Sequence, residues 1–83
     1  RQIDVIRVCG VAISSQQARE LLRVVVRDER AAGDGTAFLI ASAIATGRRT
    51  VVLTPEMSRS LAAALKRSTV PGFRSLAVAA TLH

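Results

Sequence analysis

The sequence predicts an α+β domain in which a small sheet of two or slightly more strands packs against three helices. Three observations support this prediction: two segments rich in β-branched residues, three longer segments with apolar residues at helical spacing, and their order along the chain, β-α-α-β-α. The 83 residues are enough for one domain, 1–83, and too few for two. Because so short a chain buries a modest core, self-association would add to its stability.

The first extended segment covers residues 3–13, which are rich in valine and isoleucine. Apolar residues fall on both faces of such a strand, which is typical of a strand covered on both sides. A short hairpin that turns at Cys9 and Gly10 is the alternative, because glycine adopts the positive φ that tight turns need. We favour the single strand.

A first helix is expected to begin at Ser14 or Ser15. Ser14 and Gln17 have the spacing of a capping box, in which each side chain accepts a hydrogen bond from the backbone N–H of the other residue. The apolar stripe that would face the core consists of Ala18, Leu21, Leu22 and Val25. The helix is expected to end within residues 31–35, where Gly33 is a suitable C-terminal cap.

A second helix is expected over residues 36–46, with Asp34 or Thr36 as its N-terminal cap and Gly47 at its end. It is apolar on nearly all sides, through Phe38, Leu39, Ile40, Ala41, Ala43 and Ile44. Such a helix should be the most buried element of the domain, or it should pack against a partner. Both a homodimer or docked complex and a central helix buried within the monomer fit this pattern.

A second, shorter strand is expected over residues 50–53, followed by a third helix. Thr54 suits the N-cap, Pro55 the first helical position, and Glu56 the positive end of the helix dipole. The apolar stripe of this helix consists of Met57, Leu61, Ala64 and Leu65, and the helix should end before the Pro-Gly pair at 71–72. The tail is ambiguous, since residues 75–82 fit either a helix that packs Leu76, Ala79 and Ala80 or a frayed end.

Two short stretches resemble a pattern found in short uncharacterised proteins of actinobacteria and their phages. The first is Gly10-Val11-Ala12-Ile13-Ser14 with Ala18-Arg19-Glu20-Leu21, and the second is Val52-Leu53-Thr54-Pro55-Glu56 with Leu61-Ala62-Ala63-Ala64-Leu65. This resemblance implies no particular activity.

The C-terminal half also resembles a ribbon-helix-helix DNA-binding unit, through the segments Arg48-Arg49-Thr50-Val51-Val52-Leu53-Thr54-Pro55-Glu56 and Gly72-Phe73-Arg74-Ser75. The resemblance implies a strand that pairs with its twin in a dimer and enters the major groove. Arg49 or Thr50 and Val52 would then face outward, and Thr54 would open a helix whose N-terminus touches phosphate. The sequence departs from the family pattern in carrying valines where base-reading polar residues are expected.

Arginines form the most organised polar pattern. Arg19, Arg23, Arg27 and Arg30 would share one face of the first helix, opposite its apolar stripe. Such a face could bind phosphates or could simply be solvated. A second basic cluster is Arg48-Arg49, between the second helix and the second strand. Lys66 and Arg67 fall at the end of the third helix, where cations are ordinary partners of the helix dipole.

The sequence offers little material for catalysis or for binding a cofactor or metal ion. The only histidine, His83, is at the terminus, and Cys9 has no imidazole nearby in the sequence to activate it. No set of His, Cys and carboxylate residues has the spacing of a zinc site. We therefore expect no enzyme, no cofactor and no metal. A lone unpaired thiol suits the cytoplasm, and no apolar run approaches the ~20 residues that span a membrane.

The charge balance points to an anionic partner. Twelve Lys and Arg residues against six Asp and Glu residues give a net charge of +6, while the absence of Trp and Tyr argues against single-strand binding by base stacking. The sequence therefore predicts a small non-enzymatic regulatory or accessory protein that binds nucleic acid through Arg19, Arg23, Arg27, Arg30, Arg48 and Arg49. The alternative is a protein–protein interaction module or homodimer that uses its apolar helices and has no nucleic-acid role.

Overall fold

The computed structural model describes residues 5–83, and it begins with a β-hairpin. Strand β1 (Val5–Val8) pairs antiparallel with β2 (Val11–Ser14), with Ile6 opposite Ile13. Cys9 (φ 52°) and Gly10 (φ 80°) form the two-residue turn, as expected when both central residues have positive φ. The favoured single strand is therefore wrong and the hairpin alternative is confirmed; residues 3 and 4 of that prediction lie outside the described residues.

The physical reason is that the side chains of a strand point alternately to its two faces. In one continuous strand, Ile6 and Val8 would lie on the face opposite to Ile13, because successive side chains alternate. The turn reverses the chain and brings all three to one face, where each is at most 5% exposed. The hairpin thus buries Ile6, Val8 and Ile13 together on one face of the sheet, whereas a single strand would divide them between two faces.

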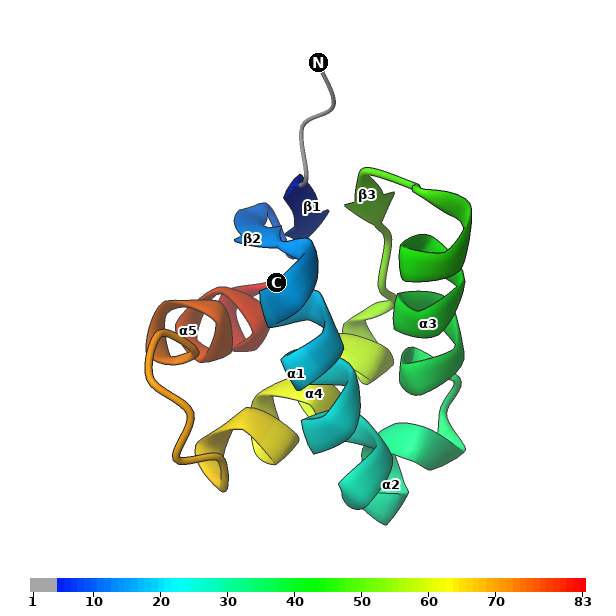
Figure 1. The fold of residues 1–83 in the computed structure, drawn as a ribbon. Coiled ribbons are helices and arrows are strands. Elements are labelled where there is room, and N and C mark those ends of the chain that lie inside the picture. The colour runs from blue at the N-terminus through cyan, green and yellow to red at the C-terminus, as the bar shows by residue number, and fades with distance from the viewer. Residues whose placement is uncertain (1–4) are drawn as a thin grey trace.

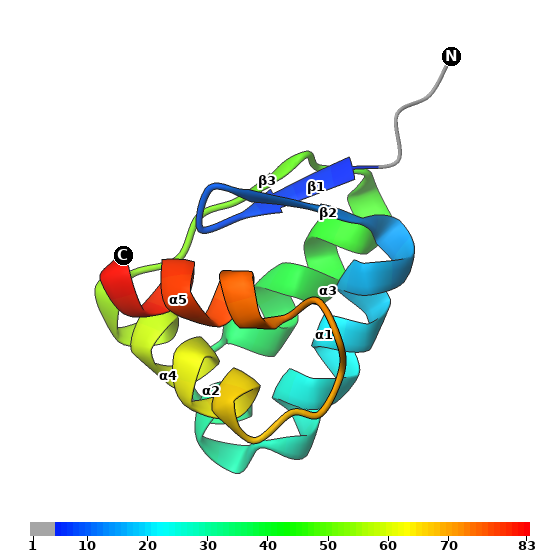
Figure 2. The ribbon, with the colours of Figure 1, turned by 90° about the vertical axis from the view of Figure 1, so that its left-hand side faces the viewer.

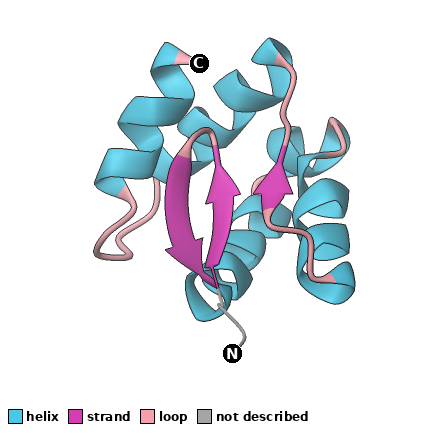
Figure 3. Cartoon of the chain, turned by 90° about the horizontal axis from the view of Figure 1, so that it is seen from above, coloured by secondary structure: helices cyan, strands magenta, loops and turns pink. Residues whose placement is uncertain are grey.

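The third strand completes a small sheet of order β2-β1-β3. Strand β3 (Thr50–Val51) pairs parallel with β1, with Val8 opposite Val51, and the backbone N–H of Arg7 donates to the carbonyl of Arg49 at 2.7 Å. It is shorter than the predicted strand over residues 50–53. Figure 3 shows the sheet against the helices, which confirms the predicted α+β class.

Helix α1 (Ser15–Arg27) begins at the predicted capping box and buries Ala18, Leu21 and Val25. It ends earlier than predicted, because Asp28 is extended (φ −91°, ψ 111°) and opens a separate short helix, α2 (Glu29–Gly33). The Asp28 side chain accepts hydrogen bonds from the backbone N–H groups of Arg30 and Ala31. Gly33 is therefore the last residue of α2 and does not cap α1.

Helix α3 (Thr36–Thr46) has the predicted bounds. Its N-cap is Gly35 (φ 88°), which forms no side-chain cap hydrogen bond, so the prediction of Asp34 or Thr36 at that position is wrong. The Asp34 carboxylate instead accepts hydrogen bonds from both the backbone N–H and the hydroxyl of Thr36 in the turn before the helix. The expectation that this is the most buried element is wrong: only Thr36, Ile40 and Ala43 are buried, and Phe38 is 74% exposed. The helix lies at the edge of the molecule and packs one side against α1 (Figure 1).

Helix α4 (Pro55–Lys66) contributes more buried residues than any other described helix, namely Ser58, Leu61, Ala62, Ala64 and Leu65. As predicted, Thr54 caps it, accepting from the backbone N–H of Met57, and Pro55 occupies its first position. The tail forms a further helix, α5 (Arg74–Leu82), which buries Leu76 and Ala80. It packs along α4 and touches β2 (Figure 2), so the C-terminal segment is part of the fold.

Candidate nucleic-acid interface

The exposed face of α1 carries three of the four predicted stripe arginines. Arg19, Arg23 and Arg27 are exposed, opposite the buried stripe of that helix, and each lies about 6 Å along the helix axis from the next. Arg30 is also exposed but belongs to the first turn of α2. The prediction of one continuous four-residue stripe is thus wrong at Arg30, because the break at Asp28 changes the direction of the chain.

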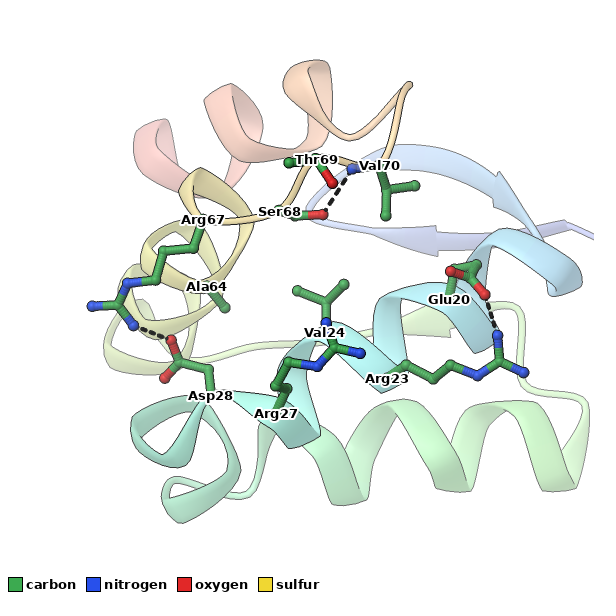
Figure 4. Close-up of a pocket in the computed structure, with 10 residues that line it drawn as sticks. All are labelled: Glu20, Arg23, Val24, Arg27, Asp28, Ala64, Arg67, Ser68, Thr69 and Val70. Carbon is green, nitrogen blue, oxygen red and sulfur yellow. Dashed lines mark hydrogen bonds and ion pairs between the residues drawn. The ribbon is translucent and has the colours of Figure 1, made fainter.

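A groove borders this face. It has a volume of about 240 Å³ and lies between α1, the end of α4 and the loop of residues 67–73, here called the α4–α5 loop (Figure 4). We call it the first pocket. Its lining consists of Glu20, Arg23, Val24, Arg27, Asp28, Ala64, Arg67, Ser68, Thr69 and Val70. Three arginines and two hydroxyl residues from distant parts of the sequence therefore meet at one depression.

Two carboxylates partly neutralise the first pocket. Glu20 forms an ion pair with Arg23 one turn along α1. Asp28, whose side chain is only 8% exposed, receives a hydrogen bond from the guanidinium of Arg67 at 2.5 Å. Arg27 has no ion-pair partner among residues 5–83. Its guanidinium is therefore the cation of this groove most available to an incoming anion.

Sequence reasoning misses the residues that the α4–α5 loop contributes. It explains Arg67 as a partner of the α4 dipole and gives no reason to single out Ser68 and Thr69. The Ser68 hydroxyl oxygen accepts from the backbone N–H of Val70 at 3.1 Å, which leaves the hydroxyl proton available for donation. The run of two cations followed by two hydroxyl residues is a visible signal, but its placement opposite Arg27 depends on the packing of α4 against α1.

Arg48 and Arg49 belong to a different part of the surface. Both are exposed and lie between α3 and β3, at the sheet end of the molecule, whereas α1 ends beside α2 at the opposite end (Figure 1). Neither lines the first pocket. The structure therefore divides the six predicted arginines into an α1–α2 group and a separate sheet-end pair.

The strand singled out by the ribbon-helix-helix resemblance is short. Arg49, Thr50 and Val52 are exposed, while Val51 and Leu53 are buried. The strand pairs in parallel with β1 of the same chain.

Cys9, the one cysteine, is half-buried beside Ser58, with 3.8 Å between the sulfur and the hydroxyl oxygen. Burial raises the pKa of the Cys9 thiol, and the hydrogen bond with Ser58 only partly opposes this rise. The thiol is thus protonated near neutral pH and is a weak nucleophile. Within residues 5–83 no group of three or more His, Cys, Asp and Glu side chains is placed to hold a metal ion.

Among the helices of residues 5–83, none is both long enough and apolar enough to span a bilayer. Comparison with known proteins finds no matching family model, no matching curated protein and no matching solved structure. The function is therefore inferred from the surface described above.

Proposed function

We propose that this protein is a small non-enzymatic regulatory or accessory protein that binds nucleic acid through phosphate contacts. The observation that carries the proposal is the environment of Arg27, an exposed cation with no ion-pair partner in the described chain, in a groove that also holds the hydroxyls of Ser68 and Thr69. Guanidinium and hydroxyl groups are among the donors that commonly contact phosphate oxygens.

The charge around this groove also favours a polyanion. Arg19 continues the exposed cationic face along α1, and Arg30 follows on the first turn of α2. The net charge of +6 adds a long-range attraction. Of the two phenylalanines, Phe73 is buried and Phe38 lies on α3, so no aromatic residue lines the first pocket. Contacts with the backbone of a duplex are therefore favoured over base stacking.

The test is a salt titration of binding to a short duplex DNA of mixed sequence, followed by fluorescence anisotropy. The variant R19A/R27A removes the two α1 arginines that have no ion-pair partner in the described chain. Each lost phosphate contact should reduce the slope of log K against log salt by about 0.9, so this variant should lose about 1.8.

The matched control is R7A/R59A, which removes the same net charge from exposed positions that do not line the first pocket. It should retain nearly the full slope. The proposal fails if the wild-type protein does not bind the duplex at low salt, or if R19A/R27A and R7A/R59A behave alike.

A second candidate function, a protein-interaction module without a nucleic-acid role, is favoured by the exposure of Phe38. A 74% exposed phenylalanine on a helix that is apolar on most sides is the kind of side chain that interfaces cover. This candidate predicts that the wild-type protein self-associates at micromolar concentration and that F38S is a monomer. Light scattering coupled to size-exclusion chromatography decides it, and a monomeric wild type counts against the homodimer.

A further inference from the structure

A second pocket lies on the other side of the α4–α5 loop. It has a volume of about 550 Å³ and shares Ser68, Thr69 and Val70 with the first pocket. Its remaining lining consists of Leu65, Lys66, Pro71, Gly72, Phe73, Arg74 and Ala77. The loop with its two hydroxyl residues therefore separates two adjoining depressions, and both are bordered by cations.

The charge of the second pocket is unopposed. Lys66 and Arg74 are exposed, and no carboxylate is among the lining residues. Neither cation has an ion-pair partner in the part of the chain that the structure describes. The first pocket, in contrast, contains Glu20 and Asp28. Of the two, the second pocket is the stronger attractor for an anion.

Helix electrostatics account for one of these cations and not for the other. Lys66 is in the last turn of α4, where a positive charge is favoured by the helix dipole. Arg74 is the first residue of α5, where a positive charge is disfavoured, and the first turn of that helix carries no acidic residue to offset it. The position of Arg74 is thus electrostatically unfavourable in the free protein. An anion bound in the pocket would interact favourably with both the Arg74 guanidinium and the N-terminus of α5.

The shape of the loop holds the two cations and the hydroxyls together. The chain turns at Pro71 and Gly72, where Gly72 has a φ of 91°. Gly72 lies against the start of α1, so that a Cβ atom added to it would stand 3.8 Å from Nε2 of Gln17. The buried ring of Phe73 fixes the loop to the core immediately before Arg74. The donors are therefore presented on a supported turn.

We propose that the second pocket binds a phosphate group through Lys66 and Arg74. If the phosphate belongs to nucleic acid, this inference rests on the proposed function. The second pocket would then supply a second phosphate contact in addition to the one at Arg27. A free phosphate would be bound by the same groups, so the two sources must be distinguished by experiment.

The first experiment repeats the salt titration with K66A/R74A, again with R7A/R59A as the control of equal charge. Because Lys66 and Arg74 hold one phosphate between them, a contact to nucleic acid predicts that K66A/R74A loses about 0.9 from the slope and that the control does not. Circular dichroism of each variant verifies that the fold is intact, which is expected because the replaced side chains are exposed.

The second experiment uses inorganic phosphate as the probe and follows backbone amides of the wild-type protein by nuclear magnetic resonance. Binding in the pocket predicts saturable shifts at Ser68, Thr69 and Arg74 that K66A/R74A lacks. Shifts together with a reduced slope assign the phosphate to nucleic acid, whereas shifts without a change in slope assign it to a free phosphate. Absence of saturable shifts, with K66A/R74A identical to the control in DNA binding, overturns the inference even if R19A/R27A supports the proposed function.

Discussion

Replacement of Asp28 tests how the break between α1 and α2 is held. One carboxylate oxygen of Asp28 caps α2, accepting from the backbone N–H groups of Arg30 and Ala31 at 3.0 and 3.3 Å, and the other receives the guanidinium of Arg67. Loss of an N-terminal cap costs about 1 kcal/mol. The ion pair is worth less, about 0.5 kcal/mol, because the Arg67 side chain is 66% exposed and screened by solvent.

These values predict that D28A lowers the free energy of unfolding by about 1.5 kcal/mol. D28N retains one oxygen for the cap but presents an NH₂ group to Arg67, so it should lose only about 0.5 kcal/mol. For a domain of this size 1 kcal/mol corresponds to a Tm change of about 4–8 °C, which is readily measured.

Urea denaturation followed by circular dichroism measures these differences, and the double variant D28N/R67A separates the two roles. The coupling energy between D28N and R67A should be about 0.5 kcal/mol if the ion pair contributes as assigned. Equal stability of D28A and D28N would refute the assignment, because the cap would then contribute nothing to the junction between the helices.

Three further predictions concern other parts of the molecule. G10A should destabilise the protein by about 1–2 kcal/mol, because a side chain is strained at the positive φ of the hairpin turn, whereas G33A, at an ordinary helical position with open space around it, should be neutral or stabilising in the same urea titration. E20Q should strengthen binding to duplex DNA at low salt, because it releases the guanidinium of Arg23; unchanged affinity in the anisotropy assay would count against a role for that arginine. Burial raises the pKa of Asp34, but the nearby Ser60 hydroxyl and the hydrogen bonds from Thr36 outweigh this, so that the net pKa lies below its ordinary value of 3.8. The carboxylate therefore contributes its full stabilisation above that value, and the contribution is lost as the pH falls below it. D34N should lack this part of the acid sensitivity when the free energy of unfolding is measured against pH.

Local sequence signals correctly identify where α1 and α4 begin, although the start of α2 was not predicted. The capping box of Ser14 and Gln17, and the Thr54-Pro55 start of α4, depend on hydrogen bonds between residues three positions apart. The buried stripes of α1 and α4 follow from the helical period in the same way. These features could be predicted because every group involved lies within one or two turns of the chain.

The candidate site could be predicted only in part. The exposure of Arg19, Arg23 and Arg27 follows from their position opposite the apolar stripe of α1. The contribution of Arg67 could not be predicted, because its partner Asp28 is 39 positions away in the sequence and is brought beside it only by the packing of α4. The folded surface likewise decides which arginines have an ion-pair partner and which do not.

The sequence by itself determined the α+β class, where the main helices begin, and the cationic face of α1, because these arise from neighbouring residues and from composition. Only the tertiary structure decided that residues 5–14 form a hairpin, that Phe38 is exposed, and that the α4–α5 loop lies between two basic pockets. Each of these depends on which distant segment covers a given surface, and the local pattern of apolar residues does not identify that segment.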